Sequence, residues 1–182
     1  MKFTEQYISG VWLIEPSVFS DDRGYFMESF KQAEFDKFVG KTDFIQDNES
    51  KSSRGVLRGL HYQTGEFAQA KLVRVIQGSV LDVAVDIRKS SPTFGQYVAV
   101  ELTAENKKQL FVPRGFAHGF VVLSNTAIFT YKVDNVYAPG YEASIIWSDP
   151  TIGIDWGISE DELILSGKDK TGKLLTEAIL FE

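Results

Sequence analysis

The two histidines of the chain lie in similar sequence settings and could perform acid–base chemistry. His61 lies in VLRGLHYQ and His118 in VPRGFAHGF, each a few residues after an Arg-Gly pair and among apolar neighbours. Imidazole has an unperturbed pKa of about 6.5, so it can take up or release a proton near neutral pH. A single histidine in an apolar segment is more often a satisfied core residue than a catalyst. Two of them in one pocket would suit proton transfer.

Tyr131 and Lys71 are predicted to point into the same interior as His118. The period-2 geometry of RGFAHGFVV and IFTYKV places His118 and Tyr131 on apolar faces. Lys71 opens KLVRV and shares a face with Val73 and Val75. A lysine on an apolar face costs free energy unless it has a partner or a task. Convergence of these polar groups in an apolar cavity indicates a functional site.

The segments that must position these side chains are typical of β-strands. VLDVAVDIR alternates strictly between apolar and polar residues, and KLVRVIQGSVLDV is typical of two strands joined at a turn around Gly78. TFGQYVAVEL, KQLFVPRGFAHGFVVLS and AIFTYKVDNVY are rich in Val, Phe and Tyr. Turn residues recur roughly every ten positions, as in antiparallel sandwiches and barrels. We predict one all-β domain over residues 1–182, a jelly-roll or cupin-like barrel, with short peripheral helices in 29–40 and 159–169.

Composition restricts the partners of the chain. At 182 residues it is long enough for one domain with a real core, and a net charge of −6 argues against a nucleic-acid partner. The absence of cysteine excludes disulfides and thiolate chemistry. No apolar run approaches the ~20 residues of a membrane span, and the N-terminus lacks a signal-peptide core. We therefore expect a cytoplasmic protein without a membrane partner.

A metal site is the alternative use of the histidines. PRGFAH fits the P-x-G-x-x-H pattern of the second cupin motif, whose histidine is often a metal ligand. The first cupin motif would need H-x-H, whereas this chain has His61-Tyr62-Gln63. Two histidines with carboxylates could still bind iron or manganese. Because the second histidine of the first motif is missing, we predict that there is no metal cofactor.

Seven blocks, in order over about 150 residues, resemble the dTDP-4-dehydrorhamnose 3,5-epimerase family. They are DDRGYFMESF, FIQDNESKSSRGVLRGLHYQ, KLVRVIQGSVLDVAVDIR, PRGFAHGF, YKVDNVYAPGYE, IIWSDPTIGIDW and LSGKD. The resemblance implies a cupin fold, a homodimer, a dTDP-4-keto-6-deoxy sugar substrate and no cofactor.

The resemblance also implies roles for individual residues. His61 matches the general base, Asp169 the carboxylate that pairs with it, and Tyr131 the general acid. Lys71 and His118 match residues around the sugar and its enolate.

Further positions match contacts to the nucleotide. Arg23 and Arg58 match contacts to the nucleotide and its phosphates, and Tyr137 matches the aromatic ring that stacks on thymine. The remaining implied binding positions are Glu28, Gln46, Asn48, Glu142 and Lys168. We expect Arg54 and Arg88, in contrast, to be surface arginines with weak ion pairs.

The implied chemistry needs these residue types. In a 4-keto sugar, C3 and C5 flank the carbonyl, so enolate formation acidifies their protons. Inversion requires a base on one face of the ring and an acid on the other. Two alternatives remain open: an enzyme that inverts one carbon of a related sugar, and a non-catalytic sugar-binding cupin. The second has no need of an acid and a base on opposite faces.

Overall fold

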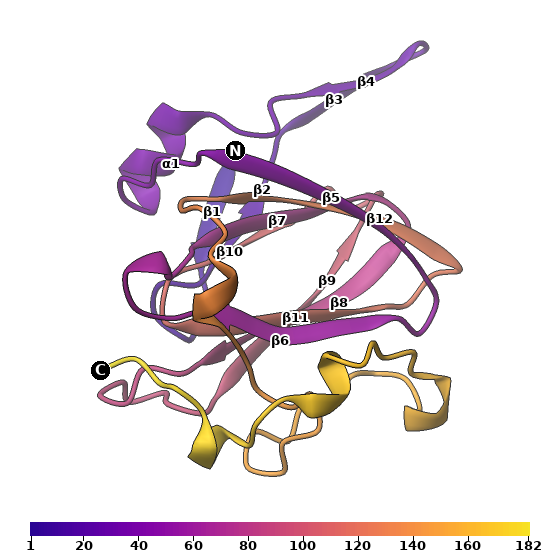
Figure 1. Ribbon diagram of the computed structural model, residues 1–182. Helices are drawn as coiled ribbons and strands as arrows, with labels where there is room; N and C mark the ends of the chain where they lie inside the picture. The colour runs from indigo at the N-terminus through magenta and orange to yellow at the C-terminus, as the bar shows by residue number, and fades with distance from the viewer.

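Two antiparallel β-sheets face each other in the computed structural model, which describes all 182 residues (Figure 1). In spatial order, the six-stranded sheet consists of β1 (Lys2–Glu5), β2 (Trp12–Glu15), β10 (Gln109–Val112), β7 (Lys71–Gln77), β12 (Thr126–Val133) and β5 (Gln46–Ser53). The five-stranded sheet consists of β13 (Glu142–Ser144), β6 (Leu57–Gln63), β11 (Phe116–Val122), β8 (Ser79–Asp86) and β9 (Tyr97–Thr103). A separate hairpin is formed by β3 (Val18–Asp21) and β4 (Gly24–Met27). The predicted all-β jelly-roll class is confirmed.

The chain passes repeatedly from one sheet to the other. β7 and β8 are joined at Gly78, as the sequence predicts, and Gly78 has a φ of +75°. The two strands do not pair with each other, because β7 belongs to the six-stranded sheet and β8 to the five-stranded sheet. This crossing turns the inner faces of both sheets toward one interior.

The core between the sheets contains the faces predicted from the period-2 pattern. Val73 of β7, Phe120 of β11 and Phe129 of β12 belong to one buried cluster. The rings of Phe120 and Phe129 stack across the two sheets with centroids 4.2 Å apart. His118 and Tyr131 alternate with the same register as these rings, so their side chains share the interior.

β8 is buried on both faces. Val83 and Val85 pack with Trp156 in a second cluster, on the side of the sheet that the C-terminal segment covers (Figure 1, yellow). The polar face of the strand, with Asp82 and Asp86, is fully buried as well. The alternation along β8 therefore separates residues that face the space between the sheets from residues that face the C-terminal segment. Neither set faces solvent.

One of the two predicted helices forms. α1 (Gln32–Phe38) lies within 29–40, and Phe35 anchors it on the outer face of the six-stranded sheet, 5.1 Å from the ring of Phe111. The remaining helical turns are the 3-10 turns η1 (Gly65–Phe67), η2 (Pro139–Tyr141), η3 (Glu160–Glu162), η4 (Asp169–Thr171) and η5 (Leu175–Glu177). No helix is long and apolar enough to cross a membrane.

The helix predicted over 159–169 is wrong. The 3-10 turn η3 forms there instead, the chain continues extended to Ile164, and a separate 3-10 turn, η4, begins only at Asp169. The N–H of Ile164 donates to the carbonyl of Gly55 at 2.8 Å, and its carbonyl accepts from Leu57 at 3.1 Å. These backbone groups satisfy the strand edge next to β6, so they are not free for helical hydrogen bonds.

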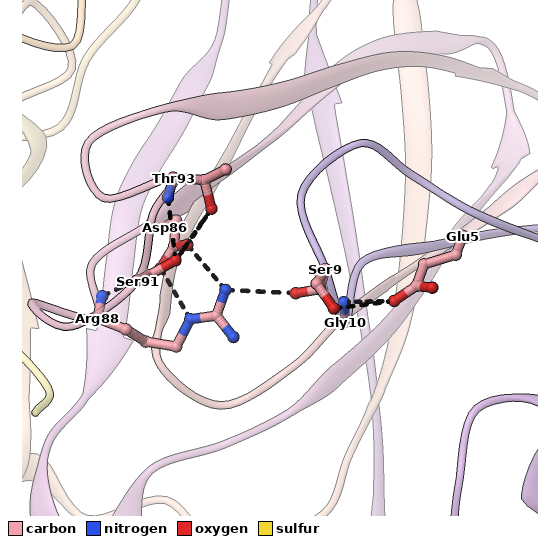
Figure 2. Close-up of polar contacts among 7 residues, drawn as sticks. All are labelled: Glu5, Ser9, Gly10, Asp86, Arg88, Ser91 and Thr93. Atoms are coloured by element: carbon pink, nitrogen blue, oxygen red, sulfur yellow. Dashed lines mark hydrogen bonds and ion pairs between the residues drawn. The ribbon is translucent and has the colours of Figure 1, made fainter.

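A buried carboxylate ties the end of β8 to the N-terminal loop (Figure 2). Asp86 accepts from Arg88 Nε at 2.8 Å, from Ser91 Oγ at 2.6 Å and from Thr93 Oγ1 at 2.7 Å. Arg88 also donates to the carbonyl of Ser9 at 3.3 Å. Burial alone would raise the pKa of Asp86, but these hydrogen bonds lower it to about 2. The expectation that Arg88 is a weakly paired surface residue is wrong, because its guanidinium neutralises a fully buried carboxylate.

We expect Asp86→Asn to lower the free energy of unfolding at pH 7 by about 3 kcal/mol, since it leaves the Arg88 guanidinium without its anion. The pKa of Asp86 is lower in the folded state than in the unfolded state. Its contribution is therefore complete above pH ~4 and falls as the pH approaches 2. Urea unfolding of both proteins from pH 7 to pH 2 measures this difference. A difference that stays constant across that range would contradict the assignment.

Candidate active site

The pairing of β6 with β11 places the two histidines opposite each other. His61 is the register partner of His118, and the register shifts between His118 and Phe120. The strands approach closely at Gly59, where a Cβ would lie 2.5 Å from the Cα of Gly119. Gly59 has a φ of +143°, which also favours glycine. The sequence therefore uses glycine to bring the histidine-bearing strands together.

A cavity of about 270 Å³ opens beside this histidine pair. Its lining comes from both sheets and consists of Asn48, Glu49, Ser50, Arg58, His61, Lys71, His118, Phe120, Phe129 and Tyr131. The structure thus brings together the polar residues that the strand pattern aimed inward, along with Arg58 and Asn48. An apolar floor with a few convergent polar groups is typical of a small-molecule site.

Asp169 lies directly against His61. Its Oδ1 is 2.8 Å from Nε2 of His61, although the ring N–H is not aligned with it and Nε2 has no hydrogen-bond partner. The carboxylate is held by the N–H of Gly59 at 3.2 Å and by the hydroxyl of Ser166. Burial alone would raise the pKa of Asp169, but the hydrogen bonds from Ser166 and Gly59 and the proximity of His61 lower it overall. Asp169 is therefore a fixed anion next to the ring.

His61 is neutral at physiological pH. Burial lowers its pKa to about 4, and the charges of Lys71 and Lys168 act in the same direction. Asp169 and Glu142 oppose the shift but do not cancel it. A neutral imidazole beside a carboxylate can accept a proton, and the carboxylate then stabilises the resulting cation.

Lys71 and Tyr131 complete the cavity with a cation and a neutral donor. Burial lowers the pKa of Lys71 to about 8, while Asp82 and Glu142 keep it from falling further, so Lys71 is mostly charged at neutral pH. Its Nζ donates to the carbonyl of His61 at 3.4 Å. Burial raises the pKa of Tyr131, so its phenol stays protonated.

His118 forms a second histidine–carboxylate pair, with Asp82, which is not among the predicted site residues. Its Nε2 lies 3.0 Å from Oδ2 and 3.1 Å from Oδ1 of Asp82. Asp82 is fully buried and fixes the imidazole in the cavity wall. The signal in the sequence was that Asp82 alternates with the apolar residues of β8. When both faces of a strand are buried, a polar residue at such a position points into the protein.

A polar chain outside the cavity lining lies close enough to His61 and Lys71 to affect their pKa values. Glu142 accepts a short hydrogen bond from Lys168 and a second one, of 3.2 Å, from the hydroxyl of Tyr137. Burial alone would raise the pKa of Glu142, but Lys168 and Tyr137 lower it overall. The three predicted binding residues therefore form one group, with the ring of Tyr137 exposed.

The donor set does not fit the metal alternative. His61 and His118 each face a different carboxylate, Asp169 and Asp82. No group of three or more His, Cys, Asp or Glu side chains could hold a metal ion.

The chain matches the family model described as dTDP-4-dehydrorhamnose 3,5-epimerase over residues 5–177. It belongs to this family. It is 56% identical over 176 residues to the dTDP-4-dehydrorhamnose 3,5-epimerase of Salmonella typhimurium, and the match covers 96% of both chains. A crystal structure of the epimerase from Elizabethkingia anophelis superposes with a TM-score of 0.94 at 51% identity and covers 97% of both chains. The structure of the Legionella pneumophila enzyme, solved in complex with dTDP-4-keto-L-rhamnose, superposes with a TM-score of 0.93 at 48% identity. The match covers 97% of this chain and 93% of that one. The family recognised from the sequence motifs, with its cupin-type sandwich, is confirmed.

Six of the binding positions implied by the family do not line the cavity: the group of Tyr137, Glu142 and Lys168 described above, and Arg23, Glu28 and Gln46. Arg23 lies in the exposed β3–β4 turn and pairs with Asp21. Glu28 pairs with Lys31 at 3.7 Å. Gln46, at the start of β5, donates to Asn48, a residue of the cavity wall, at 2.8 Å, but is itself exposed.

We expect the imidazole of His61 to titrate near pH 4 in NMR spectra of the folded protein, well below its unperturbed value of about 6.5. Asp169→Asn should lower this pKa further, because it removes a charge that favours the protonated ring. Between the folded-state pKa of about 4 and the unfolded-state pKa of about 6.5, the unfolded state binds more protons at His61 than the folded state does. The free energy of unfolding therefore falls as the pH falls through this range. Asp82→Asn serves as the control that removes the other paired carboxylate. A pKa of His61 that is unchanged in Asp169→Asn would contradict the pairing.

Proposed function

We propose that this protein inverts C3 and C5 of dTDP-4-dehydro-6-deoxy-D-glucose to give dTDP-4-dehydro-L-rhamnose, in dTDP-L-rhamnose biosynthesis. The observation that carries the proposal is the neutral His61 beside Asp169, across one cavity from the protonated Tyr131. His61 lies on β6 and Tyr131 on β12, in opposite sheets, so a sugar ring between them would meet a base on one face and an acid on the other. Family membership and the ligand of the Legionella relative support the choice of substrate.

Each inversion proceeds by removal and return of a proton. His61 takes the proton from the carbon next to the ketone, and the electron pair of the broken C–H bond forms the enolate. The Lys71 ammonium and the His118–Asp82 pair face the developing oxyanion, where one well-placed donor is worth about 3 kcal/mol. Tyr131 then donates its phenolic proton to the opposite face of the carbon. Asp169 stabilises the imidazolium until it releases its proton to solvent, and the Tyr131 phenolate takes up a proton from solvent before the next inversion.

The nucleotide portion of the substrate is assigned to Arg58 and the group around Tyr137. Arg58 lines the cavity and can bind a diphosphate through its planar guanidinium, which Ser52 holds by hydrogen bonds of 3.1 and 3.2 Å. Tyr137 offers an exposed ring for thymine, next to Glu142 and Lys168.

A homodimer would account for the position of Arg23 far from the cavity lining. The hairpin of β3 and β4 pairs only with itself and projects from the sandwich (Figure 1). Its Phe19, Tyr25 and Phe26 are 64%, 57% and 67% exposed. A second copy of the chain would cover these rings and could receive Arg23 at its own nucleotide site. The cytoplasmic location expected from the sequence stays a prediction.

The test is incubation of the protein with dTDP-4-keto-6-deoxyglucose in heavy water, with deuterium followed by NMR at C3 and C5. We expect label at both carbons together with formation of the L-rhamno product. His61→Asn is the matched control, because it keeps a polar side chain but removes the base, and it should abolish exchange while dTDP binding remains. Label at one carbon would indicate the single-site epimerase, and no label would indicate the sugar-binding cupin.

We expect Tyr131→Phe to separate proton exchange from inversion. The variant keeps the ring and its packing, while His61 still removes the proton and Lys71 still faces the enolate. The enolate is then reprotonated mainly by His61 on the original face, so deuterium enters the starting sugar while inversion falls by about 10²-fold or more. Exchange and inversion are followed in one NMR sample. Equal losses of both would show that Tyr131 also acts in deprotonation.

A further inference from the structure

Gln63 makes a two-point contact with the backbone on either side of Tyr137. Its Nε2 donates to the carbonyl of Val136 at 3.0 Å, and its Oε1 accepts from the N–H of Ala138 at 2.7 Å. These groups belong to the two peptide planes that flank the Cα of Tyr137. Fixing both planes fixes the backbone angles of Tyr137, and with them the direction of the Cα–Cβ bond from which its ring extends.

The amide of Gln63 has no remaining freedom. Its Nε2 also donates to the carbonyl of Phe67 at 2.8 Å, so both of its N–H groups and its oxygen are bound. The side chain is 4% exposed. Two carbonyls and one N–H surround it, so the amide can adopt only one orientation. A buried, fully satisfied amide is a rigid support.

Tyr137 depends on this support because its own side chain is weakly held. The ring is 55% exposed, and its only hydrogen bond is the one of 3.2 Å from its hydroxyl to Glu142. Asn135, on the N-terminal side of Tyr137, donates a hydrogen bond to the carbonyl of Glu66 at 2.8 Å. It does not contact the two peptide planes that flank Tyr137. Gln63 alone binds these planes through a side chain.

We infer that Gln63 is the positioning residue for the nucleobase platform. This inference rests on the proposed function, in which Tyr137 stacks on the thymine of the substrate. Gln63 ends β6, two residues after His61, so one strand carries both the catalytic base and the support of the base-stacking ring. The base that acts on the sugar and the ring that stacks on the nucleobase are thereby fixed relative to each other.

The test is Gln63→Met in the full-length chain, which keeps the length of the side chain and removes all three hydrogen bonds. Affinities for dTDP and for inorganic pyrophosphate are measured by calorimetry, with melting temperatures to confirm folding. We expect dTDP affinity to fall about tenfold, in line with the loss of a stacked base, while pyrophosphate affinity changes by less than about twofold. In turnover, the KM should rise by a similar factor with little change in kcat.

A double-mutant cycle decides whether Gln63 acts through Tyr137. In a Tyr137→Ala background, Gln63→Met should cause no further loss of dTDP affinity. The matched control is Tyr62→Phe, which removes a hydrogen bond of 2.8 Å from the neighbouring residue of β6 to the carbonyl of Ile179 and should leave dTDP affinity unchanged. If Gln63→Met does not fold, the shorter Gln63→Asn, which cannot span both groups, is used in the same cycle.

Several outcomes would overturn the inference. They are equal losses of dTDP and pyrophosphate affinity, an additive loss in the Tyr137→Ala background, and unchanged dTDP affinity in either Gln63→Met or Tyr137→Ala. The proposed function fails by a different readout: a wild-type protein that binds dTDP but neither exchanges nor inverts the sugar protons. The two failures are therefore distinguishable.

Discussion

The close approach of β6 and β11 at Gly59 is the constraint on which the site depends. A side chain at this position would collide with the backbone of Gly119, so the register that sets His61 opposite His118 requires glycine. The same Gly59 donates its N–H to Asp169 and so fixes the carboxylate that faces His61. One backbone contact thus positions the base, its anionic partner and the strand that carries the second histidine. The remaining cavity residues come from strands whose inner faces are set by ordinary alternation.

Burial decides the charge states in the cavity. A carboxylate 2.8 Å from His61 would by itself favour the protonated ring, yet desolvation and two nearby lysines lower its pKa to about 4. Lys71 experiences the same desolvation but keeps most of its charge near neutral pH, because Asp82 and Glu142 lie close to it. The site therefore holds a neutral base and a cation side by side. Enolate chemistry needs this combination, since the base must be free before the oxyanion forms and the cation must be present when it does.

Period-2 alternation in the sequence predicts which side chains face the space between the two sheets, even on β11, which is buried on both faces. It places His118, Tyr131 and Lys71 on inner faces, and the structure brings them to one cavity. It misses Asp82 of β8 and misjudges Arg88, which follows the strand, because β8 is covered on both sides and the polar positions of VLDVAVDIR look like a solvated face. Whether a second layer covers a sheet depends on contacts with segments far along the chain, and local pattern does not contain that information.

The C-terminal segment shows the same limit from another side. Residues 159–169 have the composition of a short helix, but the free edge beside β6 takes up their hydrogen-bonding groups at Ile164. Tertiary pairing overrides a weak helical preference there, since an unpaired buried strand edge costs more than a helix of a few residues gains. The extended path then leads to the turn that carries Asp169.

The two Arg-Gly pairs before the histidines illustrate how similar sequence settings can have different functions. Gly59 is required by the approach to β11, whereas Gly115, with a φ of +89°, is required because a Cβ there would lie 2.7 Å from Cγ of Arg88. Arg58 lines the cavity, but Arg114 pairs with Asp134 at 2.9 Å and thereby holds the entry to β7. What the two settings share is the need for glycine at a crowded position, within β6 for Gly59 and directly before β11 for Gly115. The chemistry follows from what each arginine and histidine then meets across the fold.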